Sequence, residues 1–107
     1  MSQPTDKTIH ESERMRRLAE KDRHRLLASP RRRVILKVLA EQSSTLTLEE
    51  LATAVATREK GSVDEEVVET VAVSLHHAHL PKMARVGVLT YDPDTHHIDG
   101  HREFITI

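Results

Sequence analysis

The stretch over residues 71–89, VAVSLHHAHLPKMARVGVL, most constrains how this chain can fold. Its apolar side chains recur at helical spacing as far as Pro81, and one further helical turn is expected before Gly87. Glycine is the usual residue just past the end of a helix, and an apolar β-type run begins directly after it at Val88. A helix that passes through a short extension and one glycine into a strand is compatible with few architectures, and we expect the rest of the chain to support it.

Two helices are predicted before this stretch. Ser29-Pro30 is a strong helix start, because serine caps orphan amides and proline suits the first helical position; this helix should run to about Gln42. Residues 47–50 have the form of a capping box and begin a second, amphipathic helix that should end near Gly61. Between the two helices, residues 43–46 are expected to form a turn that leads into a short β-bridge.

The third helix is predicted over about residues 64–79. Residues 62–65 repeat the Ser-x-x-Glu start signal. At helical spacing one broad apolar arc is formed by Val67, Val68, Val71, Ala72, Leu75 and Ala78. The opposite face holds Glu66, Glu69, Thr70, Val73 and His77, with His76 on its flank. This face should therefore be open to solvent or to a partner.

The expected fold class is mainly α with a small β-hairpin (α+β). The hairpin is predicted over residues 88–105, around a turn in the Asp- and Pro-rich segment 92–95, and residues 104–107 again have the composition of a strand. Residues 1–25 are expected to form a charged, partly disordered helical arm, and residues 26–107 the folded domain.

The charges are distributed unevenly along the 107 residues, although the net charge is only −1. Residues 1–37 hold 11 Lys and Arg against 5 Asp and Glu, whereas residues 38–107 hold 5 against 12. A polyanion would be attracted by the first part and repelled by much of the second. The chain has no cysteine, no apolar run long enough to span a membrane and no signal segment, so a cytoplasmic protein without a membrane partner is expected.

Three stretches resemble winged helix-turn-helix proteins. LLASPRRRVILKVLAE resembles the opening helix of that class, LTLEELATAVA its second helix, and SLHHAHLPKMARVGVLTYD the end of the third helix with the strand that follows. The resemblance covers about residues 26–99 and is closest to small haloarchaeal winged-helix domains of uncharacterised function, which carry the His-Leu-Pro-Lys run. It is more distant to ArsR-like repressors that sense metals or stress.

This resemblance implies a winged helix-turn-helix with an N-terminal helical arm, in a halophilic, archaeal transcription regulator that is often homodimeric. The helix over about 64–79 would be the recognition helix in the major groove of double-stranded DNA, and the hairpin over 88–105 would be the wing. The side chains expected to face the bases are Thr70, Val73, Ser74 and His77. Those expected to contact the phosphate backbone are Arg31, Arg32, Arg33, Lys82 and Arg85, with Arg102.

Two features complicate this interpretation. Arg31, Arg32 and Arg33 crowd the first turn of a helix, the end that the helix dipole makes unfavourable for cations. They are expected either to contact a phosphate or an acidic partner or to form a solvated basic patch. Glu66 and Glu69 lie on the predicted recognition face and would repel DNA, although glutamate can accept a hydrogen bond from cytosine N4. The alternative is a winged-helix protein–protein interaction module that does not bind DNA.

Eight histidines raise the question of a metal site. Of the run His76-His77-x-His79, only His76 and His79 are spaced to chelate together on a helix, so no metal or other cofactor is expected. His79 is predicted to be half-buried with a ring nitrogen bonded to the backbone, and the other histidines to be solvated. The sequence has no nucleophile elbow, glycine-rich phosphate loop or paired-carboxylate motif, so neither an enzyme nor a small-molecule substrate is expected.

Overall fold

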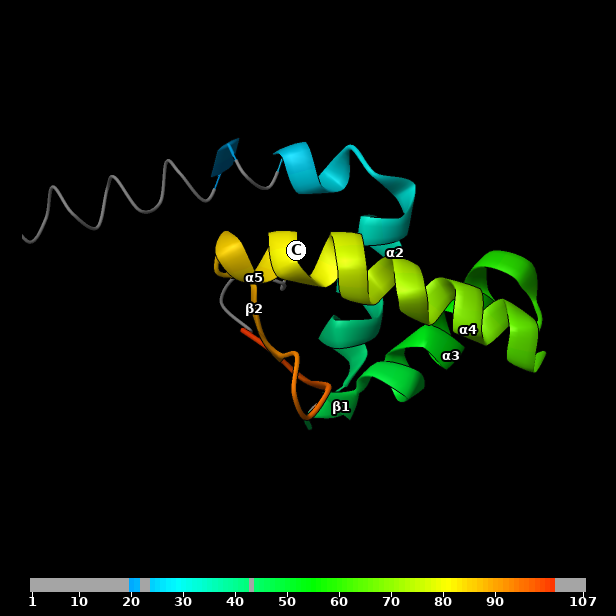
Figure 1. Ribbon diagram of the computed structural model, residues 1–107. Coiled ribbons are helices and arrows are strands. Elements are labelled where there is room, and N and C mark those ends of the chain that lie inside the picture. The colour runs from blue at the N-terminus through cyan, green and yellow to red at the C-terminus, as the bar shows by residue number, and fades with distance from the viewer. Residues whose placement is uncertain (1–19, 22–23, 43, 102–107) are drawn as a thin grey trace, which may run out of the picture.

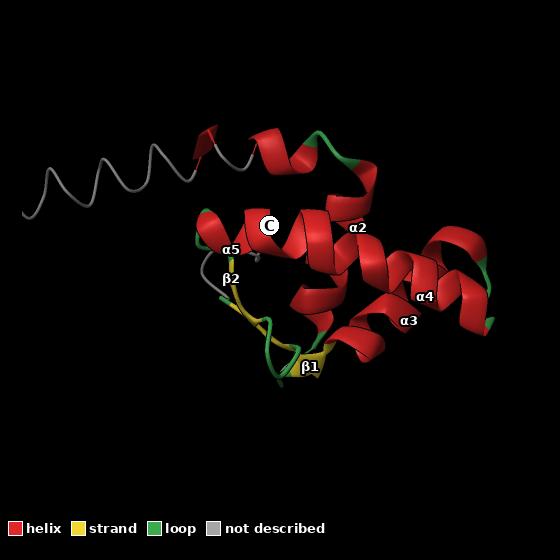
Figure 2. Ribbon diagram, viewed as in Figure 1, coloured by secondary structure: helices red, strands yellow, loops and turns green. Residues whose placement is uncertain are grey.

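The computed structural model describes residues 20–21, 24–42 and 44–101. Helical residues 24–27 lead into the following elements (Figures 1 and 2): α2 (Pro30–Glu41), β1 (Leu46–Thr47), α3 (Leu48–Lys60), α4 (Glu65–Ser74), the π-helical turn η1 (Leu75–His79), α5 (Leu80–Arg85), β2 (Leu89–Asp92) and β3 (His97–Gly100). Within these residues no helix is both long and apolar enough to cross a membrane.

The strands form a small antiparallel sheet in the order β1-β3-β2. The two strands of the hairpin pair in a register that places Tyr91 opposite Ile98, and β1 adds to the other edge of β3 by pairing Leu46 with Ile98. Ile98 is fully buried, so the central strand anchors the sheet to the core. The short bridge predicted after the first helix is confirmed as β1.

The helices enclose an aliphatic core beside this sheet. Fully buried side chains come from every helix: among them are Ile35 and Val38 of α2, Leu51 and Val55 of α3, and Val71 of α4. Leu26 is also buried, so the last turn before α2 belongs to the packed domain. In Figure 1, α4, η1 and α5 form one continuous rod across the front of the molecule, with the hairpin below one end and α3 below the other.

Three of the predicted helix ends are confirmed. Ser29 Oγ accepts from the amide of Arg32, and Pro30 opens α2. Thr47 and Glu50 form a complete capping box, with the Thr47 amide donating to Glu50 at 2.9 Å and the Glu50 amide donating to Thr47 at 3.1 Å. Gly61 ends α3 with a φ of 62°, a left-handed conformation in which glycine has no steric penalty.

The predicted start of the third helix is wrong in detail. Ser62 does not cap it; its Oγ instead accepts from the amide of Asp64, two residues later. Asp64 occupies the N-cap position of α4 without a side-chain capping bond. Serine readily makes such short local turns, and here the turn competes with the capping box and delays the helix.

The π turn η1 changes which residues of the rod are buried. The amide of Leu80 donates to the carbonyl of Leu75, five residues back. Pro81, which follows, has no amide hydrogen and in a regular helix would clash with the carbonyl four residues before it; the wider turn accommodates one extra residue. Leu75 and Leu80 are both fully buried, whereas Ala78 is exposed. The prediction that Ala78 belongs to the buried arc is therefore wrong.

The predicted fold class, mainly α with a small β-hairpin, is confirmed. The element order and the strand order are consistent with a winged helix-turn-helix. The strand predicted over 104–107, the end of the predicted wing beyond 101, and nearly all of the 1–25 arm lie outside the described residues.

Candidate nucleic-acid interface

The outer side of α4 carries the residues that the sequence placed opposite the buried arc. A shallow hollow of about 410 Å³ is lined by Glu66, Glu69, Thr70 and Val73. Val73 is 53% exposed, an unusual position for an aliphatic side chain in a chain whose other valines are mostly packed. The Thr70 hydroxyl donates to the Glu66 carbonyl at 2.9 Å and can still accept from a ligand. This side therefore combines negative charge with one apolar and one hydroxyl contact.

Ser74 and His77 continue this side less completely. Ser74 is only half-buried, and His77 is exposed with its ring edge-on to His76 at a centroid distance of 4.8 Å. All four predicted base-facing residues thus lie on the rod, and three of them, Thr70, Val73 and His77, are exposed to solvent.

The hairpin is attached to the rod through His76. Its Nδ1 lies 2.6 Å from the hydroxyl of Tyr91 on β2. Burial, followed by the nearby charge of Asp92, raises the pKa of Tyr91, so the phenol keeps its proton in this contact. The ring of His96, in the turn, lies beside that of His76, with a distance of 5.4 Å between the ring centroids. These contacts fix where the hairpin sits beside η1.

His101 makes a second attachment. Its Nδ1 donates to the carbonyl of Gly87 at 2.8 Å, and its Nε2 lies 2.7 Å from the Thr90 hydroxyl. The prediction that the histidines other than His79 are simply solvated is therefore wrong for His76 and His101. His79 is half-buried as predicted, but within the described part of the chain its ring makes no hydrogen bond, so the backbone bond expected for it is not found.

The tip of the hairpin is acidic and well ordered by hydrogen bonds. Asp92 accepts from the amides of Asp94 and Thr95, which lowers the pKa of its carboxyl. His96 follows with a φ of 63°, the left-handed conformation that closes the turn. A wing with carboxylates at its tip offers no attraction to phosphate.

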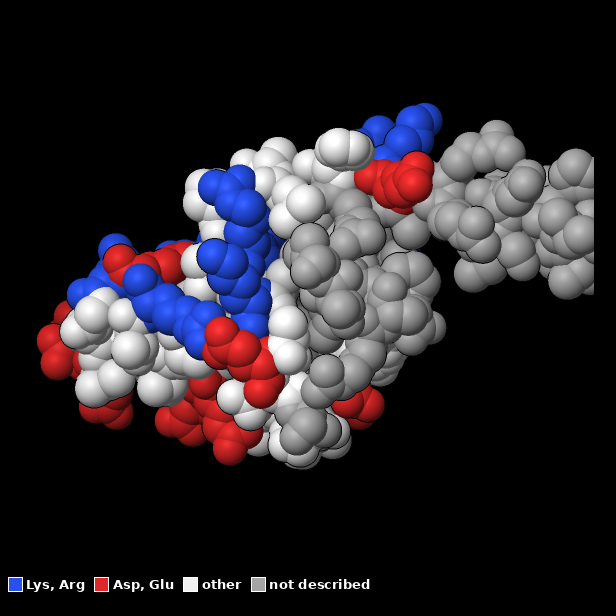
Figure 3. All heavy atoms as spheres, turned by 180° about the vertical axis from the view of Figure 1, so that it is seen from behind, with Lys and Arg blue, Asp and Glu red and all other residues white. Residues whose placement is uncertain are grey.

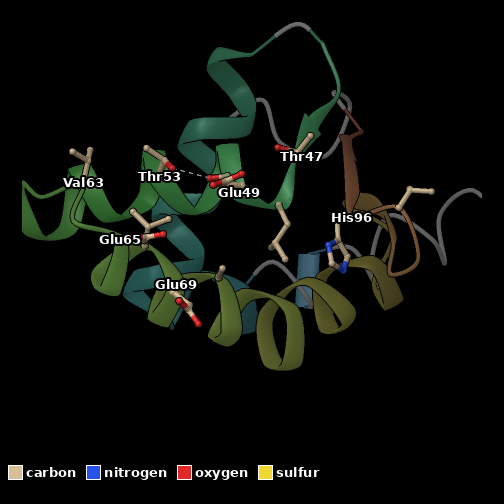
Figure 4. Close-up of a pocket in the computed structure, with 11 residues that line it drawn as sticks. Thr47, Glu49, Thr53, Val63, Glu65, Glu69 and His96 are labelled. Carbon is tan, nitrogen blue, oxygen red and sulfur yellow. Dashed lines mark hydrogen bonds between the residues drawn. The ribbon is translucent and has the colours of Figure 1, made fainter.

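A larger groove of about 610 Å³ runs between α3, α4 and the hairpin turn. Figure 4 shows Glu49 and Thr53 entering it from α3, Glu65 and Glu69 from α4, and His96 from the turn. The Thr53 hydroxyl donates a hydrogen bond to the backbone carbonyl of Glu49 at 2.8 Å. Val63, 65% exposed, lies at the mouth of the groove (Figure 4). The groove is therefore acidic with an apolar patch.

The three consecutive arginines of α2 have different surroundings. Arg31 makes a two-pronged ion pair with Glu59 at the end of α3, with N–O distances of 2.8 and 2.6 Å. Arg33 donates to the carbonyl of Leu27. Arg32 keeps its Nε away from solvent, and within the described residues that atom has no hydrogen-bond partner. Two of the three cations thus have structural partners inside the fold, and one does not.

Arg32 instead lines a basic pocket of about 350 Å³. Lys82 and Arg85 of α5 enter it from the rod, and Arg25 enters it from the turn before α2. Sequence reasoning placed Arg25 in the arm and missed it. The available signal was the short 28–29 connection, which folds the preceding turn back against α2. The structure therefore brings together three predicted phosphate contacts, Arg32, Lys82 and Arg85.

The electrostatic effect of this cluster is visible at His79. Burial, and then the positive charges of Arg32 and Arg31, lower the pKa of His79, while Glu59 opposes the shift. Seen from behind, Lys and Arg side chains line up over the described surface, with Asp and Glu gathered below them (Figure 3). Some of these charges are paired, as Arg58 is with Glu41.

No group of three or more His, Asp or Glu side chains within the described ranges is arranged to hold a metal ion. Of the histidines that the sequence grouped together, His76 bonds to Tyr91 and His101 to Thr90, so these two serve separate attachments of the hairpin.

Comparison with known proteins gives a family without an assigned role. Residues 24–99 match the family model described as a domain of unknown function, DUF7344. No curated protein matches the chain significantly, and no solved structure does. The match begins at the last helical turn before α2 and ends within β3, so it spans α2 to α5 and the sheet except the last residue of β3. Because it covers well over half of the 107 residues, the chain belongs to the DUF7344 family.

Proposed function

We propose that this protein is a non-enzymatic, DNA-binding transcriptional regulator of winged-helix type, acting in the cytoplasm as a homodimer. The observation that carries the proposal is the exposed outer side of α4 and η1, on a helix packed against α3 and flanked by a hairpin. In winged-helix proteins a helix in this setting enters the major groove. Thr70, Val73 and His77 would be the side chains that meet base edges.

Lys82 and Arg85 would supply the phosphate contacts. Both are exposed on α5, the direct continuation of the proposed recognition helix, and neither forms an ion pair within the described residues. Arg31 is a weaker candidate than its sequence position suggested, because Glu59 already neutralises it. Phosphate contacts normally supply most of the affinity for DNA, so the proposal depends on these two cations.

Glu66 and Glu69 weaken binding in this proposal but can contribute to selectivity. A glutamate can accept a hydrogen bond from cytosine N4, so a suitable base pair would compensate part of the repulsion. Salt also screens the repulsion, down to a Debye length of about 3 Å at 1 M. A protein that resembles domains of salt-adapted archaea would meet DNA under such screening.

The second candidate function is a protein-interaction module, and the acidic groove between α3 and α4 favours it. Glu49, Glu65 and Glu69 border this groove, and Val63 offers an exposed apolar contact at its mouth. A basic, amphipathic segment of another protein would fit this combination.

Selection of duplexes from a random-sequence pool, repeated from low to near-molar salt, tests the proposal. We expect enrichment of a preferred, palindromic sequence whose half-site spacing reports the dimer geometry. Thr70→Ala should weaken the preference, whereas Thr57→Ala serves as the matched control, because Thr57 makes the same hydroxyl-to-carbonyl bond on the exposed side of α3. No enrichment at any salt would contradict the proposal and favour the interaction module.

A further inference from the structure

The basic pocket is assembled from three separate parts of the chain. Arg25 and Leu26 come from the turn before α2, Arg32 from the first turn of α2, and Lys82, Arg85 and Val86 from the end of the rod. Leu26 is fully buried, so this wall of the pocket is fixed by the core. One wall of the pocket therefore belongs to the packed domain, and the exposed side chains of Arg25, Lys82 and Arg85 complete it.

Among the described residues six line the pocket; four of these are cations, and none is a carboxylate. Other described arginines have acidic partners: Arg31 pairs with Glu59, and Arg58 pairs with Glu41. Like charges gathered without a counter-charge raise the local potential and disfavour the charged forms of their neighbours. The lowered pKa of His79, caused by burial and then by Arg32 and Arg31, is in accord with such a potential. A bound anion would remove the repulsion.

Arg32 gives the second, independent observation. Its Nε lies out of reach of solvent and has no acceptor within the described residues. Buried donors are almost always hydrogen-bonded, and one left without a partner costs free energy. Because Arg32 lines the pocket, an acceptor bound there would supply the missing hydrogen bond once the guanidinium turned toward it.

The size and lining of the pocket limit the kind of anion. About 350 Å³ lies at the lower end of the range of roughly 300–1,000 Å³ that small-ligand sites occupy. Leu26 and Val86 add an apolar wall to the cationic ones. Guanidinium and ammonium groups together are the donors that proteins use for phosphate oxygens.

We propose that this pocket, lined by Arg25, Arg32, Lys82 and Arg85, binds a small, multiply charged phosphate compound as a ligand of the protein. The phosphate oxygens contact Arg32 and Lys82, and Arg85 and Arg25 close the rim. The same chemistry is present in the DNA backbone, but a recessed donor on Arg32 favours a ligand small enough to enter. The site does not depend on DNA binding by α4.

Titration of the full-length chain with inorganic pyrophosphate at fixed ionic strength tests the proposal, by calorimetry and by the NMR signal of the Arg32 Nε–H. We expect saturable binding and a shift of that signal. Replacing Arg32 and Lys82 together by glutamine should weaken binding about tenfold or more, since hydrogen bonds to charged partners are the strong ones. The matched control is Lys37→Gln with Lys60→Gln, which removes two charges from exposed positions of α2 and α3 outside the pocket.

The exposed single variant Lys82→Gln keeps the test valid if the double variant does not fold. Absence of saturable binding, or equal weakening by the pocket pair and the control pair, would overturn the proposal. A parallel titration with duplex DNA separates the two sources of phosphate. If DNA shifts the Arg32 signal and pyrophosphate does not, the pocket is a DNA contact and the small-ligand proposal fails. If pyrophosphate binds and DNA does not, the ligand site holds and the proposed DNA-binding function fails.

Discussion

The two halves of the rod differ in charge, and the helix dipole accounts for this difference. Glu65 and Glu66 occupy the first turn of α4, and Lys82 and Arg85 the end of α5. The helix dipole favours acidic groups at the start and basic groups at the end, so both sets have a local reason to be there. The acidic residues at the start of α4 are therefore weak evidence that this helix binds a basic partner.

The basic pocket is different, because its deepest cation has no such local explanation. Arg32 lies in the first turn of α2, where the dipole disfavours a cation and no acidic residue is present. Its neighbours Arg31 and Arg33 have partners in Glu59 and the Leu27 carbonyl. The comparison shows that unexplained charge, more than total charge, points to a binding site.

The largest expected effect comes from the joint between the two halves. Leu80→Ala should destabilise the protein by about 2–5 kcal/mol, because it leaves a cavity where the π turn meets the core. Val73→Ala, on the exposed side of the same rod, should change stability by less than about 0.5 kcal/mol. Urea unfolding measures both free energies. Equal effects would mean that the rod is not anchored through η1.

The opposite contributions of the two halves to DNA binding can be measured directly. Lys82→Gln with Arg85→Gln should weaken binding to duplex DNA, and Glu66→Gln with Glu69→Gln should strengthen it, each by about 1–2 kcal/mol at low salt. Both effects should shrink toward molar salt as screening increases. Fluorescence anisotropy across a salt series measures them. If the glutamate variant binds DNA more weakly, those carboxylates read bases and do not merely repel the backbone.

The Arg31–Glu59 ion pair should make a smaller, pH-dependent contribution to stability. Its hydrogen bond with Arg31 lowers the pKa of Glu59, so the stabilisation is present above the ordinary glutamate pKa and is lost as the pH falls through the lowered value. Glu59→Gln should cost about 0.5–1 kcal/mol at neutral pH and little in strong acid. Urea unfolding at the two pH values checks this. An unchanged cost in acid would mean that charge plays no part.

The smallest expected effect is on the titration of His79. Burial, and then Arg32 and Arg31, lower its pKa, so folding disfavours the protonated ring. Stability should therefore decrease as the pH falls through the ordinary histidine pKa toward the lowered one. Lys82 also lowers the pKa of His79, so Lys82→Gln and added salt should each raise it slightly in an NMR titration. No response to either change would mean that burial alone sets the shift.

The local signals in the sequence predicted most of the fold. Capping at Ser29 and Thr47 and the stop at Gly61 depend on neighbouring residues only, so they could be read without tertiary contacts. The π turn could not be predicted from a regular helical period. Its one sign in the sequence is the spacing of the buried residues Leu75, Leu80 and Met83, which are five and then three positions apart. Ala78 was misplaced for this reason.

The candidate site was less predictable, because it depends on contacts between distant residues. Arg31 and Glu59 are 28 positions apart, and nothing near either residue indicates that they pair. Arg25 and Lys82 line the same pocket only because the helical turn over residues 24–27 lies near α5 in the folded domain. The sequence shows that three arginines follow one another in α2. The structure shows that Arg31 and Arg33 have partners, whereas the Arg32 Nε has none within the described residues.

The measurement that most directly tests DNA binding through the rod is an NMR titration of the isotope-labelled full-length chain with duplex DNA at moderate salt. The account predicts that signals of Thr70, Val73 and His77 shift together with those of Lys82 and Arg85, while α3 signals around Glu49 and Thr53 stay unchanged. Shifts confined to the α3–α4 groove, or no shifts at DNA concentrations well above that of the protein, would contradict it.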